Sequence, residues 1–248
     1  MKWRRESNKL PWDSVKFDRR LLTVMTGLTS FAILIMIIAV GTDYWIVLTI
    51  PGGAWRNSTQ MFVTGTISGL WRICRKEVDN FKNPTTSRES CEYHKLFPTM
   101  KEVNRDPEVD KIIIDYSRTE TAFAVISLLI MLVGNGFALY TFKEHRYMFK
   151  RLTAFTHFVV AALVLVVLEV LINSIHYEES NLPARHPERA YHSFGFSFAF
   201  GWIVFIIYVS AGIAFLFASR KRKGDQVQTE IDPTSQIKDD EAINLGRV

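Results

Sequence analysis

Apolar residues in this chain are gathered into four blocks, each about twenty residues long and nearly free of charge. The blocks are residues 21–44, 121–142, 152–172 and 196–219. At about 1.5 Å per residue, a helix of this length crosses a hydrocarbon core roughly 30 Å thick. A soluble protein would not repeat such a block four times. The pattern therefore predicts an all-α membrane protein, built as a bundle of four transmembrane helices.

Basic residues identify the side of the membrane on which the termini lie. They cluster in residues 1–20, in the short connection after the second block, and directly after the fourth block. In a four-span chain these places share one side, which the positive-inside rule makes cytoplasmic. The net charge of +5 is explained by this topology, so nucleic-acid binding is the weaker interpretation. We expect a plasma-membrane protein with both termini in the cytoplasm and a disordered, acidic tail over residues 220–248.

The outer segments are then residues 45–120 and 173–195, and the first is long enough for a small folded ectodomain. Several runs within it are rich in β-branched and aromatic residues, which favour strands. The expected strands are 45–50, 61–67, 69–75 and 92–97. Pro51-Gly52-Gly53 and Pro98 are turn or stop signals after the first and last. These runs predict a small extracellular antiparallel sheet, whose strand order the sequence does not fix. A charged stretch at 101–116 is expected to be a short helix before the second span.

The only two cysteines, Cys74 and Cys91, lie in this outer segment. Asn57-Ser58-Thr59 is a glycosylation acceptor, which has meaning only on a surface facing the secretory lumen. Cysteines in that oxidising environment are expected to pair, and two free thiols are the alternative. A disulfide here would tie the third strand to the fourth.

Two polar residues interrupt the spans, Asn135 in the second and Glu169 in the third. Asn135 is expected to form a hydrogen bond between helices. Glu169 either has a structural role, at the interface or against a neighbouring helix, or belongs to an ion pathway. A single acid without a titratable partner at the same depth is a poor relay, which favours the structural role.

Catalytic patterns are absent from the sequence. We find no Ser/His/Asp order of the hydrolase kind, no phosphate-binding glycine loop and no paired metal-ligand spacing. One group in the second outer segment has metal-ligand chemistry, although a solvated polar loop is the ordinary interpretation; it contains His176, Glu178, Glu179, His186 and His192. We therefore expect no enzyme, no cofactor and no metal centre.

A tryptophan after the first span, then Gly-Leu-Trp and two cysteines in the first outer loop, resembles the claudin and calcium-channel gamma-subunit superfamily. These residues are Trp45, Gly69, Leu70, Trp71, Cys74 and Cys91. The likeness covers residues of about 20–220 and is closest to the gamma-subunit branch. Residues 39–45 and 68–72 are similar to the stargazin-type members, whereas 69–76 and 168–170 are more similar to the skeletal-muscle gamma subunit. The chain departs from many gamma subunits in having only two cysteines, and from stargazin-type members in lacking a PDZ-binding end.

The resemblance implies a claudin-like fold, a four-helix bundle capped by an extracellular sheet. It implies an auxiliary gamma-type subunit that binds and modulates the gating or trafficking of a voltage-gated calcium channel. The partner would be the membrane-embedded pore subunit, within the lipid bilayer. Two alternatives remain: a stargazin-like regulator of AMPA-type glutamate receptors, and a claudin-like cell-junction adhesion protein. A transporter is the weakest interpretation, because it needs a polar site at the membrane midplane that the sequence lacks.

Overall fold

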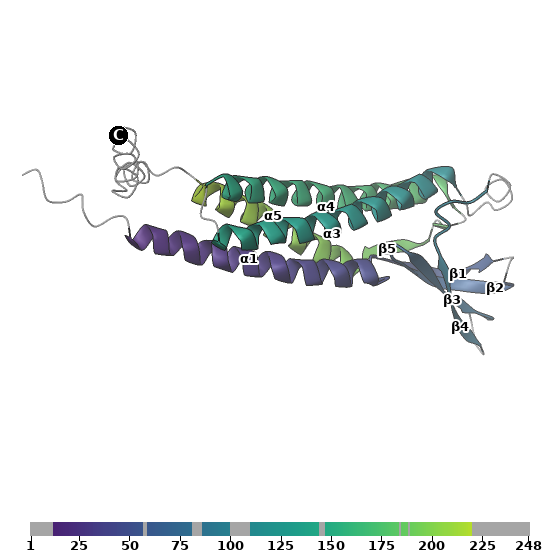
Figure 1. The fold of residues 1–248 in the computed structure, drawn as a ribbon. Coiled ribbons are helices and arrows are strands. Elements are labelled where there is room, and N and C mark those ends of the chain that lie inside the picture. Colours follow the sequence, from purple (N-terminus) through teal and green to yellow (C-terminus); the bar gives the residue numbers. More distant parts are fainter. Residues whose placement is uncertain are drawn as a thin grey trace, which may run out of the picture.

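Four long helices lie side by side, and a five-stranded sheet covers one end of the bundle (Figure 1). The computed structural model describes residues 12–56, 59–80, 86–99, 110–143, 147–183, 185–187 and 189–219. The expected acceptor Asn57 and the tail from residue 220 onward lie outside the described residues. So does most of the stretch at 101–116, for which a short helix is predicted.

The helices are α1 (Trp12–Gly41), α3 (Lys111–Lys143), α4 (Tyr147–Asn181) and α5 (Phe196–Ala218). All four are long and apolar enough to cross a membrane. The predicted four-helix membrane fold with a small antiparallel sheet is therefore confirmed. In the bundle, α3 and α5 both contact α4, and α1 contacts both α5 and α3. The start of α1 and the end of α5 lie at the end of the bundle opposite the sheet (Figure 1).

Two helices extend further into the outer segments than the apolar blocks predict. Helix α3 begins at Lys111, well before the predicted start of the span at residue 121. Helix α4 continues to Asn181 rather than ending near residue 172. Asp110 explains the early start of α3. Its Oδ1 accepts hydrogen bonds from the backbone N–H groups of Ile112 and Ile113, at 2.7 and 3.4 Å. Such a cap satisfies N–H groups that have no partner within the helix.

The sheet has the order β4-β3-β2-β1-β5, and every neighbouring pair is antiparallel. The strands are β1 (Ile46–Arg56), β2 (Met61–Ser68), β3 (Arg72–Val78), β4 (Ser87–Tyr93) and β5 (Tyr191–Phe194). The fifth strand comes from the second outer segment and pairs its four residues with the start of β1. The long connection through α3 and α4 thus returns the chain to the edge of the sheet.

Three predicted strand boundaries were wrong. The expected turn at Pro51-Gly52-Gly53 is a bulge within β1, where the register shifts between Thr49 and Ala54. Gly52 and Gly53 have φ values of 88° and 63°, which glycine adopts without strain. The strand β3 begins at Arg72 instead of 69, and β4 ends at Tyr93, whereas the prediction placed that strand at 92–97. All residues of β4 except one are exposed, so no apolar pattern marked it.

Candidate functional site

The motif residues of the first outer loop meet the helices at the junction between sheet and bundle. Trp45 is fully buried, and Leu70 lies in the same apolar cluster with side chains from the helices. The indole N–H of Trp45 donates a hydrogen bond to the carbonyl of Ala39, at 2.7 Å. A buried tryptophan contributes a large apolar surface and needs a partner for its one polar atom. Trp45 and Leu70 therefore anchor the sheet in the core of the bundle.

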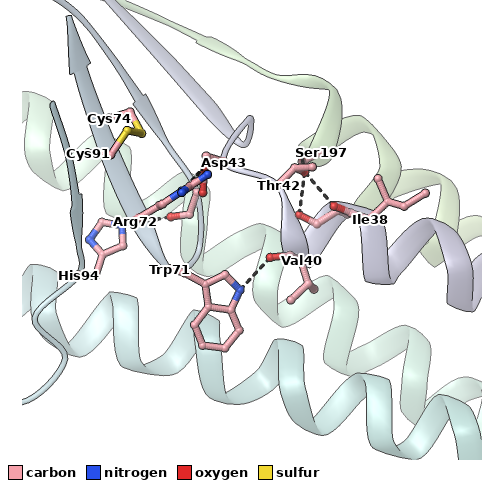
Figure 2. A network of polar contacts seen from close by, with 12 residues as sticks. Ile38, Val40, Thr42, Asp43, Trp71, Arg72, Cys74, Cys91, His94 and Ser197 are labelled. Carbon is pink, nitrogen blue, oxygen red and sulfur yellow. Dashed lines mark hydrogen bonds and ion pairs between the residues drawn. A yellow bond between two sulfur atoms is a disulfide. The ribbon is translucent and has the colours of Figure 1, made fainter. Parts of the chain in front are cut away.

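Side chains from outside α1 satisfy the last carbonyl groups of that helix. Trp71 lies in the turn before β3, and its indole N–H donates to the carbonyl of Val40 at 2.8 Å (Figure 2). Thr42 donates to the carbonyl of Ile38 at 2.9 Å. Together with the bond from Trp45, three consecutive carbonyls at the end of α1 accept side-chain hydrogen bonds. These groups have no partner within a helix, so both tryptophans of the motif act as caps of α1.

Gly69 allows the loop before β3 to approach the end of α1 closely. A Cβ at this position would lie 2.6 Å from the Cα of Asp43, a separation that no side chain tolerates. The approach brings the carboxylate of Asp43 to the guanidinium of Arg72, and the two form an ion pair (Figure 2). This hydrogen-bonded carboxylate raises the pKa of Arg72. A glycine is thus required for the contact that joins α1 to β3.

The same junction also reaches α3 and α5. Thr121 in α3 donates to the carbonyl of Leu70 at 3.2 Å. Ser197 in α5 shares a hydrogen bond of 2.7 Å with the hydroxyl of Thr42. The backbone N–H of Gly195 donates to the carbonyl of Trp45 at 2.9 Å. Residues 42–45 and 69–72 therefore connect the sheet to the outer ends of three helices.

The disulfide lies three residues beyond Trp71. Cys74 in β3 and Cys91 in β4 are directly opposite in the register of the two strands, and their sulfur atoms are bonded (Figure 2). His94 follows β4, and its ring lies 3.1 Å from the carbonyl of Gly69. Burial lowers the pKa of His94, because the charged imidazolium loses its hydration. The disulfide and His94 together hold the edge strand against the junction.

An ion-pair network on the sheet was not foreseen from the sequence. Glu77 is almost completely buried and accepts from Arg56 at 3.2 Å. Glu92 on the edge strand lies 3.1 Å from Arg75 and 3.8 Å from Arg56. The run of charged residues at 75–77 in β3 is the one signal that could have indicated it. The network links β1, β3 and β4 across the face of the sheet.

The two polar residues of the spans have different surroundings. Asn135 in α3 donates to the hydroxyl of Ser30 in α1 at 3.0 Å and accepts from Thr29 at 3.3 Å. Glu169 is exposed on α4, where its backbone carbonyl accepts a bond from Asn173. Within the described residues, no hydrogen bond or ion pair of the Glu169 carboxylate to another helix is observed. Asn135 thus joins two helices, whereas Glu169 faces away from the bundle.

The potential metal-binding group of the second outer segment is divided by the fold. His176 and Glu179 are exposed on α4. His186 and His192 have ring centroids 6.1 Å apart, and Glu178 forms an ion pair with Arg185 at 3.1 Å. Among the described residues, the one close group of three ligand atoms includes Cys74 and Cys91, which the disulfide already uses. His186, His192 and Glu178 instead line a cavity behind the sheet.

Comparison with known proteins places this arrangement in context. The family described as PMP-22/EMP/MP20/Claudin tight junction matches residues 30–217. The chain is 28% identical over 212 residues to the human voltage-dependent calcium channel gamma-7 subunit, which covers 84% of this chain and 73% of the relative. It is 28% identical to the human gamma-5 subunit over 82% of this chain and 72% of the relative. It is also 27% identical to the Bos taurus gamma-1 subunit, over 84% of this chain and 91% of the relative.

Proposed function

The chain belongs to the PMP-22/EMP/MP20/claudin family, and we propose that it is a gamma-type auxiliary subunit of a voltage-gated calcium channel. It binds the pore subunit in the plasma membrane and changes the gating or trafficking of the channel. The names of the relatives described above, each a voltage-dependent calcium channel gamma subunit, support this choice within the family. The proposed action is binding, with no catalytic step.

The observation that carries the proposal is the apolar outer surface of the bundle. Large apolar side chains are exposed on all four helices, including Leu34, Leu132, Phe155 and Ile206. Lipid or another helical protein covers such a surface in a membrane. Two glycines, Gly27 on α1 and Gly136 on α3, also face outward, with open space where a Cβ would lie. Small residues let a second helix approach closely, so α1 and α3 suit contact with a pore subunit.

The junction between the sheet and the bundle connects the proposed contact with the pore subunit in the membrane to the extracellular sheet. Because Trp45 and Trp71, next to β1 and β3, cap α1, we expect the sheet to move together with this helix. A body that binds one gating state more tightly shifts the channel towards that state. A preference of about 1.4 kcal/mol changes the equilibrium roughly tenfold.

The proposed topology puts both termini in the cytoplasm and the sheet outside the cell. The start of α1 and the end of α5 lie at the end of the bundle opposite the sheet (Figure 1), which supports this topology, as do the basic clusters at the span ends. A disulfide in the sheet suits the oxidising side of the membrane.

Co-expression with a calcium-channel pore subunit tests the proposal. A chain truncated after Gly224 should still co-purify with the pore subunit and shift the voltage dependence of gating, because the bundle is intact. Exchanging α1 and α3 for the corresponding helices of a claudin should abolish both effects.

Gly136→Leu gives a finer test, because it adds bulk to the outer surface of α3 without meeting the bundle. It should weaken co-purification at unchanged surface expression, and Gly27→Leu makes the matched change on α1. Loss of binding by the truncation, with binding retained by the claudin exchange, would contradict the proposal. If the chain co-purifies with a glutamate receptor and not with the calcium-channel pore subunit, the partner is the glutamate receptor instead.

A further inference from the structure

A cavity of about 100 Å³ lies between the inner face of the sheet and the outer ends of α3 and α4. Apolar side chains from three elements form much of its wall, among them Leu48 in β1, Ile113 in α3 and Ile175 in α4. Polar groups line the rest, including Glu120 in α3 and His186 in the connection before β5. An apolar pocket with a few convergent polar groups is the usual form of a small-molecule site.

Glu120 and His186 are both buried at this cavity with an unsatisfied polar atom. Each side chain is only 6% exposed. Within the described part of the chain, neither Oε1 of Glu120 nor Nε2 of His186 has a hydrogen-bond partner. Leaving such atoms buried and unpaired is costly, and a carboxylate costs more than a neutral group. A ligand that supplies the missing partners would remove this cost.

The other charged groups that line the cavity are compensated. Glu178 pairs with Arg185 at 3.1 Å, and Arg56 and Arg75 pair with acidic side chains of the sheet. Among the described residues, no cation forms an ion pair with Glu120. Glu120 is thus the acid of the cavity without a basic partner, and a ligand with one positive charge would stabilise its ionised form.

We propose that this cavity binds a small organic cation, a primary ammonium group on a short apolar body. The ammonium group donates to the carboxylate of Glu120, and Nε2 of His186 accepts a second hydrogen bond. The apolar body lies against Leu48, Ile113 and Ile175. A cavity of roughly 150 Å³ accommodates benzene, so about 100 Å³ suits a body of four or five heavy atoms. This inference does not depend on the proposed role in a calcium channel.

A bound metal ion fits the cavity less well. Within the described residues, the ligand atoms of Glu120, Glu178, His186 and His192 do not form a close group of three. The apolar part of the wall would also have no function in a metal site. An alkylammonium ion fits both parts of the cavity wall, because its charged group lies at the carboxyl group of Glu120 and its carbon chain at the apolar side chains.

Thermal unfolding of the purified full-length protein in detergent tests the site, with n-butylammonium chloride as the probe. A ligand that binds only the folded state raises Tm with its concentration. We expect a saturable rise with n-butylammonium. Sodium chloride at equal ionic strength and butan-1-ol, the neutral analogue of similar size, should give little or none.

Variants then identify the residues that form the site. Glu120→Gln keeps the shape of the side chain but removes the charge, and should weaken binding on the order of tenfold or more. Ser174→Leu leaves the acid in place and fills the cavity, since Ser174 lies in its wall, and it should also abolish the shift. Glu179→Gln is the matched control, because it removes an exposed acid of α4 that is not part of the cavity.

The proposal is wrong if n-butylammonium fails to raise Tm, or if butan-1-ol raises it equally. It is also wrong if Glu120→Gln binds like the wild type. Should Glu120→Gln not fold, Ser174→Leu decides, and an undiminished shift in that variant overturns the proposal. A Tm rise with zinc chloride alone, absent with the ammonium ion, would assign the cavity to a metal instead.

Discussion

Replacing both Cys74 and Cys91 by serine should release β4 from the sheet while the helix bundle stays folded. The reason lies in how little else holds this strand. It is the edge strand of the sheet, it pairs only with β3, and all but one of its residues are exposed. The apolar core of the bundle contains no residue of β4. Apart from its backbone pairing with β3 and the contacts of His94, the disulfide is therefore the main constraint on the strand.

The size of the effect follows from the loop that the disulfide closes. The two cysteines are separated by 17 residues in the sequence. For a loop of this length, the chain-entropy model gives a contribution of about 3 kcal/mol. If the whole of it opposes local opening, the open population of β4 rises on the order of a hundredfold. Surface ion pairs such as Arg75 with Glu92 add little, because Glu92 is half exposed.

Hydrogen–deuterium exchange measures this opening directly. The amides of Ser87–Tyr93 should exchange on the order of a hundredfold faster in the double serine variant, whereas those of Phe196–Ala218 should keep the wild-type rate. Using two serines avoids leaving one free thiol. Unchanged exchange in β4 would refute the reasoning. Equal acceleration in α5 would also refute it, since the disulfide would then stabilise the whole fold.

Four further predictions concern single residues. Asn57→Gln should abolish the gel-mobility shift that glycosidase treatment produces in the wild type; a remaining shift would place the glycan elsewhere. Asn135→Leu should lower the unfolding free energy by about 1 kcal/mol, measured in detergent, because it removes the hydrogen bonds to α1. Glu169→Gln should keep both surface expression and bundle stability, because the side chain faces outward; a large loss of expression would contradict this. Stability should fall as the pH drops through about 6.5, because His94 has a lowered pKa when folded and the unfolded chain takes up the proton first. His94→Gln should flatten this part of the stability profile.

The helices were the most predictable part of the fold. Their length and lack of charge identify membrane spans without any tertiary information. Their ends were less predictable, because a cap and not hydrophobicity decides where a helix starts. The cap by Asp110 allows α3 to begin at Lys111. Glu120 therefore lies in a helix and lines a cavity, whereas the sequence placed it in a loop.

The sheet shows why strands at an edge escape detection. A central strand such as β2 buries Val63 and Ile67 and exposes none of its residues fully, and its apolar run was recognised. The strands β4 and β5 lie at the two edges, where one side of the backbone has no neighbour and most side chains meet solvent. Residues 46–49 pair with 191–194. No local pattern encodes a contact over that sequence distance, so β5 could be identified only from the structure.

The junction explains why the motif needs two tryptophans and a glycine at these positions. A helix that ends near the membrane surface leaves carbonyl groups without partners, and water satisfies them only if the end is open. Here the indoles of Trp45 and Trp71 supply the hydrogen bonds, and Gly69 removes the side chain that would hold the loop away. The residues that cap α1 therefore lead directly into β1 and β3. Any partner that tilts the sheet must either break these bonds or move the end of α1 with it. Moving the helix keeps the bonds, so contact outside the membrane is expected to displace a membrane helix.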